Sequence, residues 1–494
     1  MVPPGRSDPS ASSGRCPGRL AGVPVMTLRT PEAMRRRRKV KARRRTEFGL
    51  LIAASVIIAA AYTLMILGNT SKVPADAVPL LVAMLALAAV AHIANRFLAP
   101  DASPVILPIA FLLNGIGYTM IVRIDLGNGT NYAPLQAGWS ALGVGVYVAT
   151  LFVVRRSRDL DRYRYLLLIA GVALLLAPLL PVIGLNVNGA RLWVHLGSLR
   201  FQPVELAKIL LCVFFASYFA EKRELLTIPT ARFGNRLVLD PRPLVPIVLA
   251  WVFAIGVMSL ENDIGFSALL FTLFIGMLWV TTGRTSYLVL AVVLFAIGAY
   301  IAGRYLGQVH IRVETWLDPW KYANDKGQQL VQSWYSLGSG GIGGTGLGLG
   351  QGAYRIPIAN TDFIFAVIGE EMGLLGSTMV IVAFLLLVGA GLRIAQAARS
   401  EFAKLTATGL TIIIGFQAFF IIGGIVRLFP LTGITLPFVS YGGSALVANY
   451  MLIAVLMRIS DEGGAAADAK EQTQFEKEEE RRRALLAGPG YPAG

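Results

Sequence analysis

The sequence is built around recurring apolar segments of about twenty residues, and this pattern limits the fold more than any other feature. A helix of that length crosses the hydrocarbon core of a bilayer, where unpaired backbone groups would be too costly. The pattern predicts an all-α fold, a polytopic membrane helical bundle of about 12 transmembrane helices. We place these helices near 48–68, 77–98, 104–123, 137–154, 164–184, 203–220, 242–260, 265–282, 285–304, 362–392, 405–427 and 436–457.

The basic residues predict how these helices are oriented. The net charge is +16, although only 15% of the residues are charged, and the Lys and Arg residues cluster between the apolar segments. This placement follows membrane topology rather than nucleic-acid binding, so no nucleic-acid partner is expected. Both termini are expected on the cytoplasmic side, with the basic linkers. These linkers contain Arg96, residues 155–164, residues 222–236, Arg284, residues 393–404 and Arg458.

The two ends of the chain and two of its connections are polar. Residues 1–46, rich in Pro, Gly, Ser and Arg, predict a disordered basic cytoplasmic tail, and residues 459–494 predict a solvated cytoplasmic tail in which 476–483 could form a short helix. On the outer side, the connections 185–202 and 305–361 are long. We expect these two loops to carry outer-face function, because a rigid scaffold usually presents its functional residues on loops.

Several kinds of chemistry find little support in the sequence. The two cysteines, Cys16 and Cys212, do not make a disulfide framework or a metal-binding pair, and the three histidines lack metal-ligand spacing. The glycine-rich stretch 338–352 lacks the Gly-Lys-Ser/Thr ending of a nucleotide loop. We interpret it as a flexible loop.

Charged residues at membrane depth are costly and need an explanation. Glu205 and Lys208 follow Pro203, which suits the start of a helix, and their i,i+3 spacing places them on one face. Two interpretations stay open. The pair is either a local ion pair that makes insertion tolerable or a polar wall beneath an outward-facing cavity.

Two aspartates lie at the outer mouths of apolar segments. Asp263 precedes the segment at 265–282, and capping of that helix is the favoured role for its carboxylate. Asp362 opens the segment at 362–392, about two turns before Glu370 and Glu371. Capping and action as a general base are equally favoured for Asp362, because a carboxylate at a wet helix mouth suits either role.

An interrupted segment and a group of outer cations complete the pattern. Residues 433–444 contain Pro437 and several glycines, which favour a broken or re-entrant helix start whose free N–H groups could bind an anion. The outer cations meet either lipid headgroups or a pyrophosphate. They are Arg191, Arg200, Arg312, Lys321, Lys326, Arg355 and Arg427.

Taken in order, several motifs over about 104–458 resemble the RodA/FtsW (SEDS) family of peptidoglycan glycosyltransferases. The two extra N-terminal segments and residues 114–117 are similar to the actinobacterial RodA branch in particular. The resemblance implies a multi-pass protein of the bacterial cytoplasmic membrane, with two extra helices at 47–103 and a glycosyltransferase core of ten helices at 104–458. The motifs are residues 188–193, 201–208, 263–265, 312–319, 361–366, 370–373 and 437–444.

The resemblance also implies a reaction. Such enzymes join lipid II units into glycan strands at the outer face of the membrane, for cell elongation or division, and release undecaprenyl diphosphate. Asp362 would act as the base toward the acceptor hydroxyl, and Lys208, Arg191 and Arg312 would neutralise the diphosphate. One base and one diphosphate leaving group imply a single displacement with inversion.

The same resemblance implies roles for the remaining residues and for a partner. Glu205 and Asp263 would hold the cations or bind a divalent metal such as Mg or Mn, although no metal site is defined. The expected partners are lipid II and its growing glycan, membrane lipid and a class B penicillin-binding protein with transpeptidase activity. The other substrate-binding residues would be Trp193, which stacks on a sugar, Gln202, and the cavity-shaping residues Ser440, Tyr441, Gly442, Gly443 and Ser444.

Two other functions remain open. A lipid II flippase would also use broken helices and buried charges, but a carrier places its ionisable groups near the membrane midplane. Here they gather at the outer helix mouths. A nonenzymatic morphogenesis scaffold would act through its tails, and its outer acidic residues would be dispensable.

Overall fold

The computed structural model describes residues 31–487, except 71–76, 182, 188–189, 198, 306 and most of 228–262. Helices dominate this part of the chain, and the described residues include nine helices long and apolar enough to cross a membrane. The all-α membrane bundle is thereby confirmed. These nine are α1 (Pro31–Thr70), α2 (Ala77–Leu98), α3 (Ile106–Asn128), α4 (Ala133–Val153), α9 (Ile264–Thr282), α10 (Ser286–Tyr305), α14 (Ile364–Ala397), α15 (Glu401–Ile425) and α16 (Gly443–Ala487). The bundle also contains α6 (Arg164–Leu176) and α7 (Val204–Thr227).

Three of the predicted segments differ from these nine helices. The segment at 164–184 forms a shorter helix, α6, that passes into a 3-10 turn. The segment at 203–220 forms α7, which continues to Thr227 through a charged last part. The segment at 242–260 lies mostly outside the described residues.

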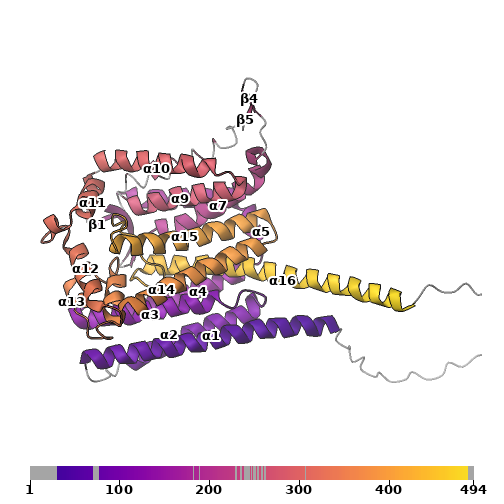
Figure 1. The fold of residues 1–494 in the computed structure, drawn as a ribbon, viewed down its shortest axis with the longest axis horizontal. Coiled ribbons are helices and arrows are strands. Elements are labelled where there is room, and N and C mark those ends of the chain that lie inside the picture. Colours follow the sequence, from indigo (N-terminus) through magenta and orange to yellow (C-terminus); the bar gives the residue numbers. More distant parts are fainter. Residues whose placement is uncertain are drawn as a thin grey trace, which may run out of the picture.

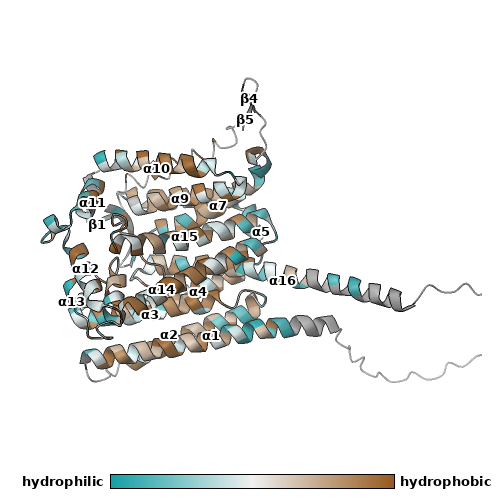
Figure 2. Ribbon diagram, viewed as in Figure 1, coloured by the Kyte–Doolittle hydropathy of each residue, from teal (hydrophilic) through white to brown (hydrophobic). Residues whose placement is uncertain are grey.

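The long helices lie side by side along one direction (Figure 1). Their middle parts are apolar and their ends polar, as expected for a bilayer-spanning bundle (Figure 2). We call the end where α1 begins and α16 projects the termini end, and the opposite end the loop end. The short elements of the termini end are α5 (Ser157–Arg162), β4 (Ala231–Phe233) and β5 (Arg236–Val238). Those of the loop end are η1 (Ala177–Leu179), β1 (Gly184–Val187), β2 (Ala190–Leu196), β3 (Leu199–Phe201), α11 (Gly307–Leu317), η3 (Trp320–Tyr322), α12 (Gln328–Gly340) and α13 (Gly352–Arg355).

The two ends of the described chain are helical where tails are predicted. Helix α1 begins at Pro31, so residues 31–46 belong to a helix in the structure, and residues 1–30 lie outside the described residues. Helix α16 runs on to Ala487, so most of the predicted C-terminal tail is helix too. Lys39 and Arg43 of α1 form ion pairs with Asp468 of α16 at 3.4 and 3.3 Å, which joins these two helices beyond the bundle.

The two N-terminal helices pack on the rest of the bundle, α1 on α3 and α2 on α4. A buried polar cluster fixes their termini end. The Glu47 carboxylate pairs with Arg44 and with His92 Nδ1 at 2.9 Å, and it accepts a hydrogen bond from Asn95 Nδ2 at 3.1 Å. Tyr147 of α4 donates to Asn95 Oδ1 at 2.5 Å. Because each of these side chains has a partner, the cluster is compatible with burial.

The connection at 305–361 is largely helical, and its glycine-rich part is firmly held. The Glu370 carboxylate accepts hydrogen bonds from the Gln351 and Gly352 N–H groups at 2.8 and 2.6 Å. The Glu371 carboxylate accepts from Gly348 N–H at 2.9 Å and from Arg123 Nε at 2.7 Å. Four donors on two buried carboxylates fix this segment. The prediction of a flexible loop at 338–352 is therefore wrong.

Candidate active site

Charged side chains from four elements meet at the loop end of the bundle. Glu205 and Lys208 lie in the first turns of α7, and Asp263 precedes α9. Arg312 belongs to α11, and Asp362 precedes α14. These elements are separated by long stretches of sequence, so the bundle itself brings the residues together.

Glu205 and Lys208 form a buried ion pair. Both side chains are almost completely inaccessible, and Lys208 Nζ lies 2.5 Å from Glu205 Oε2. Nζ also donates to Gln417 Oε1 at 3.1 Å and lies 5.5 Å from the Phe266 ring centroid. Paired charges with an extra hydrogen bond tolerate burial, whereas either charge alone would not. Gln417 is not among the residues predicted for the site, although an amide within an apolar segment is a signal for such a role.

Asp263 caps α9, as favoured from the sequence. Its Oδ1 accepts a hydrogen bond from Phe266 N–H at 3.0 Å, while its buried Oδ2 has no partner among the described residues. Burial raises the pKa of this carboxyl group to about 6, against the opposing effect of the Arg312 cation, and Glu205 adds to the increase. The preceding residues Glu261 and Asn262 lie outside the described residues.

Asp362 does not cap a helix. The N-cap of α14 is Phe363, and no side chain caps that helix. Asp362 is partly exposed and makes no hydrogen bond or ion pair with the residues that the structure describes. Desolvation raises the pKa of its carboxyl group to about 6, while the nearby Arg312 cation lowers it. An unpaired carboxylate with a pKa near neutrality is suited to accept a proton.

Arg312 is the cation that both aspartates share. Its Nη1 donates to the Thr432 and Leu431 carbonyls at 2.7 and 3.3 Å, which fixes the guanidinium beside the 431–433 turn. The other guanidinium N–H groups have no partner within the described part of the chain. They are available to an anion, because a guanidinium offers five donors.

The interrupted segment before α16 holds the Asp362 turn in place. Ser440 Oγ donates to the Thr361 carbonyl at 2.6 Å and accepts from Leu436 N–H at 3.0 Å. Tyr441 N–H donates to the Asn360 carbonyl at 2.8 Å. The non-helical stretch around Pro437 therefore does two things, since it starts α16 and fixes the residues next to Asp362.

Other residues of this segment shape its surroundings. Ser444 Oγ accepts a hydrogen bond from Gln202 N–H at 2.8 Å, which ties the start of α16 to the start of α7. The Tyr441 ring lies 4.8 Å from the Tyr132 ring, centroid to centroid. At Gly443 a Cβ atom would lie 2.2 Å from the Trp139 ring, so a larger residue would not fit. At Gly442 a Cβ atom would lie 3.3 Å from Thr435 Cγ2, closer than most side chains approach a neighbour.

Arg191 and Trp193 lie on β2, the central strand of the sheet β1-β2-β3. Arg191 is exposed and Trp193 is half-buried. Within the described residues, neither side chain makes a hydrogen bond or ion pair with the charged group of α7, α9 and α11. Because β2 belongs to the loop end, the structure places these two predicted residues at the same end of the bundle as that group.

The charged residues do not fit a divalent metal. No group of three or more His, Cys, Asp or Glu side chains that could hold a metal occurs in the described part of the chain. Glu205 is already paired with Lys208, and Arg312 lies beside both aspartates. Each of the three carboxylates therefore has a cation beside it, which disfavours a further bound cation.

Comparison with known proteins adds independent evidence. The model of the FTSW_RODA_SPOVE family, described as cell cycle protein, matches residues 101–464. The peptidoglycan glycosyltransferase RodA of Mycobacterium tuberculosis is 41% identical over 425 residues, which are 85% of this chain and 90% of that protein. A probable peptidoglycan glycosyltransferase FtsW of Methylomonas methanica is 33% identical over 72% of this chain and 91% of that protein.

One solved structure is also similar. It is described as the structural coordination of polymerization and crosslinking by a peptidoglycan synthase complex, and the matching chain is 25% identical. The match covers 72% of this chain and 96% of that one, with a TM-score of 0.56.

Proposed function

This chain belongs to the FtsW, RodA and SpoVE family and is a peptidoglycan glycosyltransferase, and we propose that Asp362 is the general base of its reaction. The observation that carries the proposal is the state of that carboxylate. It is partly exposed, it has no partner among the described residues, and its pKa is raised to about 6. The greater identity to the RodA relative than to the FtsW relative agrees with the resemblance to the RodA branch.

The proposed substrate is lipid II, which supplies both a glycosyl donor and an acceptor. The Asp362 carboxylate takes the proton from the acceptor hydroxyl as that oxygen attacks the anomeric carbon of the donor. The bond from this carbon to the diphosphate oxygen breaks, and undecaprenyl diphosphate leaves with the bonding electrons. A single displacement of this kind inverts the anomeric centre.

Arg312 is the best supported contact for the leaving diphosphate. Its unused N–H groups lie close enough to Asp362 to affect the pKa of that residue. Arg191, exposed on β2, is the second proposed cation. Lys208 is inaccessible and bonded to Glu205 and Gln417, so we assign it to positioning the start of α7 rather than to direct contact.

The other predicted residues are assigned the roles that the resemblance implies. Trp193 stacks on a sugar, and Gln202 lies at the substrate cavity. Asp263 holds Arg312 electrostatically, and residues 440–444 shape the cavity and fix the Asp362 turn.

The proposed topology has both termini in the cytoplasm and the loop end outside. It is supported by the basic residues of the termini end, which include Arg43, Arg393 and Arg458. The proposed partner is a class B penicillin-binding protein that crosslinks the glycan strands. The similar chain in a peptidoglycan synthase complex supports this pairing.

The test is synthesis of glycan strands from labelled lipid II by the purified full-length chain with its transpeptidase partner. Asp362→Asn keeps the size of the side chain and removes the base, so we expect a loss of at least about a hundredfold in rate, the usual contribution of general base catalysis. Asp325→Asn is the matched control, because Asp325 is exposed at the same end of the bundle.

Two outcomes contradict the proposal. If Asp362→Asn makes strands at the wild-type rate, then Asp362 is not the base. If the wild-type protein makes no strands but moves lipid II across vesicle membranes, then the flippase function is correct.

A further inference from the structure

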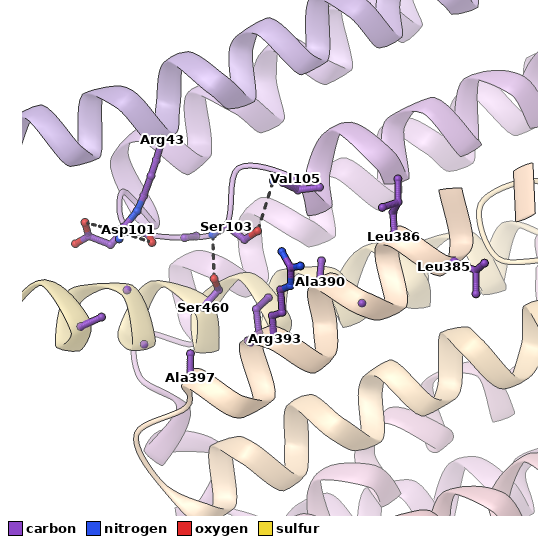
Figure 3. A pocket seen from close by; sticks show the side chains of 16 residues that line it. Arg43, Asp101, Ser103, Val105, Leu385, Leu386, Ala390, Arg393, Ala397 and Ser460 are labelled. Atoms are coloured by element: carbon purple, nitrogen blue, oxygen red, sulfur yellow. Dashed lines mark hydrogen bonds and ion pairs between the residues drawn. The ribbon is translucent and has the colours of Figure 1, made fainter. Parts of the chain in front are cut away.

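A cavity of about 440 Å³ opens at the termini end of the bundle (Figure 3). Asp362 precedes α14 at the opposite, loop end. It lies between α1, the link that joins α2 to α3, the second half of α14 and α16. The polar part of its lining includes Arg43, Ser103, Arg393 and Ser460. None of these residues belongs to the proposed catalytic site.

The two arginines of the cavity differ in how their charge is balanced. Arg43 pairs with Asp101 and with Asp468, both at 3.3 Å, so its charge is neutralised within the protein. Arg393 is exposed on α14 and makes no hydrogen bond or ion pair with any described residue. Figure 3 shows its side chain extending from α14 toward the link around Ser103. The described lining of the cavity therefore contains one cation without a counter-ion.

The apolar part of the lining lies deeper along the same helix. Leu385 is eight residues before Arg393, about 12 Å along the helix axis, and with Leu386 it lies within the apolar span of α14. These two leucines are 64% and 55% exposed in the isolated chain, so they face lipid in the membrane. Between them and Arg393, Gly389 and Ala390 leave space against the helix.

We propose that this cavity binds an anionic glycerophospholipid from the leaflet at the termini end. Its phosphodiester lies against the Arg393 guanidinium, and one acyl chain follows Leu385 and Leu386 into the bilayer. Basic pockets between transmembrane helices are known to hold anionic headgroups. The polar and the apolar parts of the lining are separated along the membrane normal, as the headgroup and the acyl chains of such a lipid are. A single uncompensated cation matches the single negative charge of such a lipid.

The experiment is native mass spectrometry of the full-length protein in detergent, titrated with dioleoylphosphatidylglycerol. Dioleoylphosphatidylcholine has the same chains and no net charge, and undecaprenyl phosphate tests the other lipid phosphate of bacterial membranes. We expect phosphatidylglycerol to bind about tenfold more tightly than phosphatidylcholine, the size of one charge-assisted hydrogen bond.

Four variants test the two halves of the site. Arg393→Gln should abolish the preference for phosphatidylglycerol, while Arg399→Gln, at an exposed arginine just after α14 that does not line the cavity, should keep it. Gly389→Leu fills the apolar part, and its Cβ would meet no atom within 4 Å, so the helix accommodates it. This variant should weaken binding of both dioleoyl lipids. Unchanged melting temperatures show that each variant is folded, and Arg393→Lys should restore the preference.

Three results overturn the proposal. The first is an equal affinity of wild type and Arg393→Gln for phosphatidylglycerol. The second is full binding by Gly389→Leu, which would locate the lipid outside the cavity. The third is displacement of phosphatidylglycerol by a lower concentration of undecaprenyl phosphate, which would assign the site to a prenyl phosphate.

Discussion

The raised pKa of Asp362 predicts how the rate of glycan synthesis depends on pH. Asp362 is the proposed general base and would act only when it is ionised, so we expect activity to increase with pH through the pKa of this carboxyl group. Burial raises that pKa from 3.8 to about 6. The pH at which half of the Asp362 side chains are ionised is thereby moved into a range where the rate of glycan synthesis can be measured.

The size of the effect follows from this pKa. With a pKa of about 6, roughly 90% of the Asp362 side chains are ionised at pH 7 and roughly 10% at pH 5, so the rate should fall about tenfold between these values. With the ordinary value of 3.8, more than about 90% would be ionised even at pH 5, and the rate would hardly change.

The assay is the initial rate of strand formation at low lipid II concentration between pH 5 and pH 8. Arg312→Gln should raise the midpoint, because the arginine cation stabilises the ionised carboxylate. Arg355→Gln is the control, as Arg355 is exposed on α13 at the same end of the bundle and its side chain has no partner among the described residues. Asp263 has a similar pKa, so Asp263→Asn must retain the midpoint if Asp362 is the titrating group.

A rate at pH 5 within twofold of the rate at pH 7 would refute the reasoning. A pH midpoint that shifts in Asp263→Asn but not in Arg312→Gln would also refute it. Either result would mean that the ionisation of Asp362 does not limit the reaction.

Three further predictions concern the framework of the site. Lys208→Met leaves the buried Glu205 carboxylate unpaired and should cost about 3–5 kcal/mol of stability, seen as a lower melting temperature, whereas adding Glu205→Gln should recover much of it. Gly340→Ala would place a Cβ 2.1 Å from a backbone oxygen of α14 and should destabilise the protein by about 1–3 kcal/mol in the same assay, while Gly338→Ala, which has open space, should not. Ser440→Ala removes a hydrogen bond from the Asp362 turn and should lower kcat for strand synthesis about fivefold with an unchanged melting profile, since one such bond contributes about 1 kcal/mol.

The fold class could be predicted because the bilayer imposes a length on each apolar helix. The tails could not be predicted in the same way. Residues 31–46 are polar and basic, and nothing nearby in sequence shows that they form a helix. Their contacts are distant, since Lys39 and Arg43 pair with Asp468, more than 420 residues away. The composition of residues 31–46 therefore does not indicate such a pairing.

The two aspartates differ in how much of their role can be predicted from the neighbouring residues in the sequence. Asp263 caps α9 through a residue three positions later, so its role is visible in the sequence. The role of Asp362 depends on its turn, in which Ile358 has a φ of 54° and residues 360 and 361 are bound by Tyr441 and Ser440. Capping was an equal alternative for Asp362 because that turn is determined by a segment about 80 residues away.

The glycine-rich segment 338–352 differs from its prediction for a similar reason. Glycine frees the backbone, and from sequence alone this indicates flexibility. In the folded chain the freedom allows several N–H groups to converge on Glu370 and Glu371. Which carboxylates would receive these bonds is a property of the tertiary structure.

Helix α16 has a mechanical consequence for the enzyme. Its 45 residues make a continuous rod of about 68 Å that starts three residues after Ser440 and ends beyond the opposite face of the bundle. A force applied to the projecting part would be transmitted along the rod to the bonds that hold the Asp362 turn. A protein that binds the projecting part would thereby act on the proposed catalytic turn at the opposite end of the bundle.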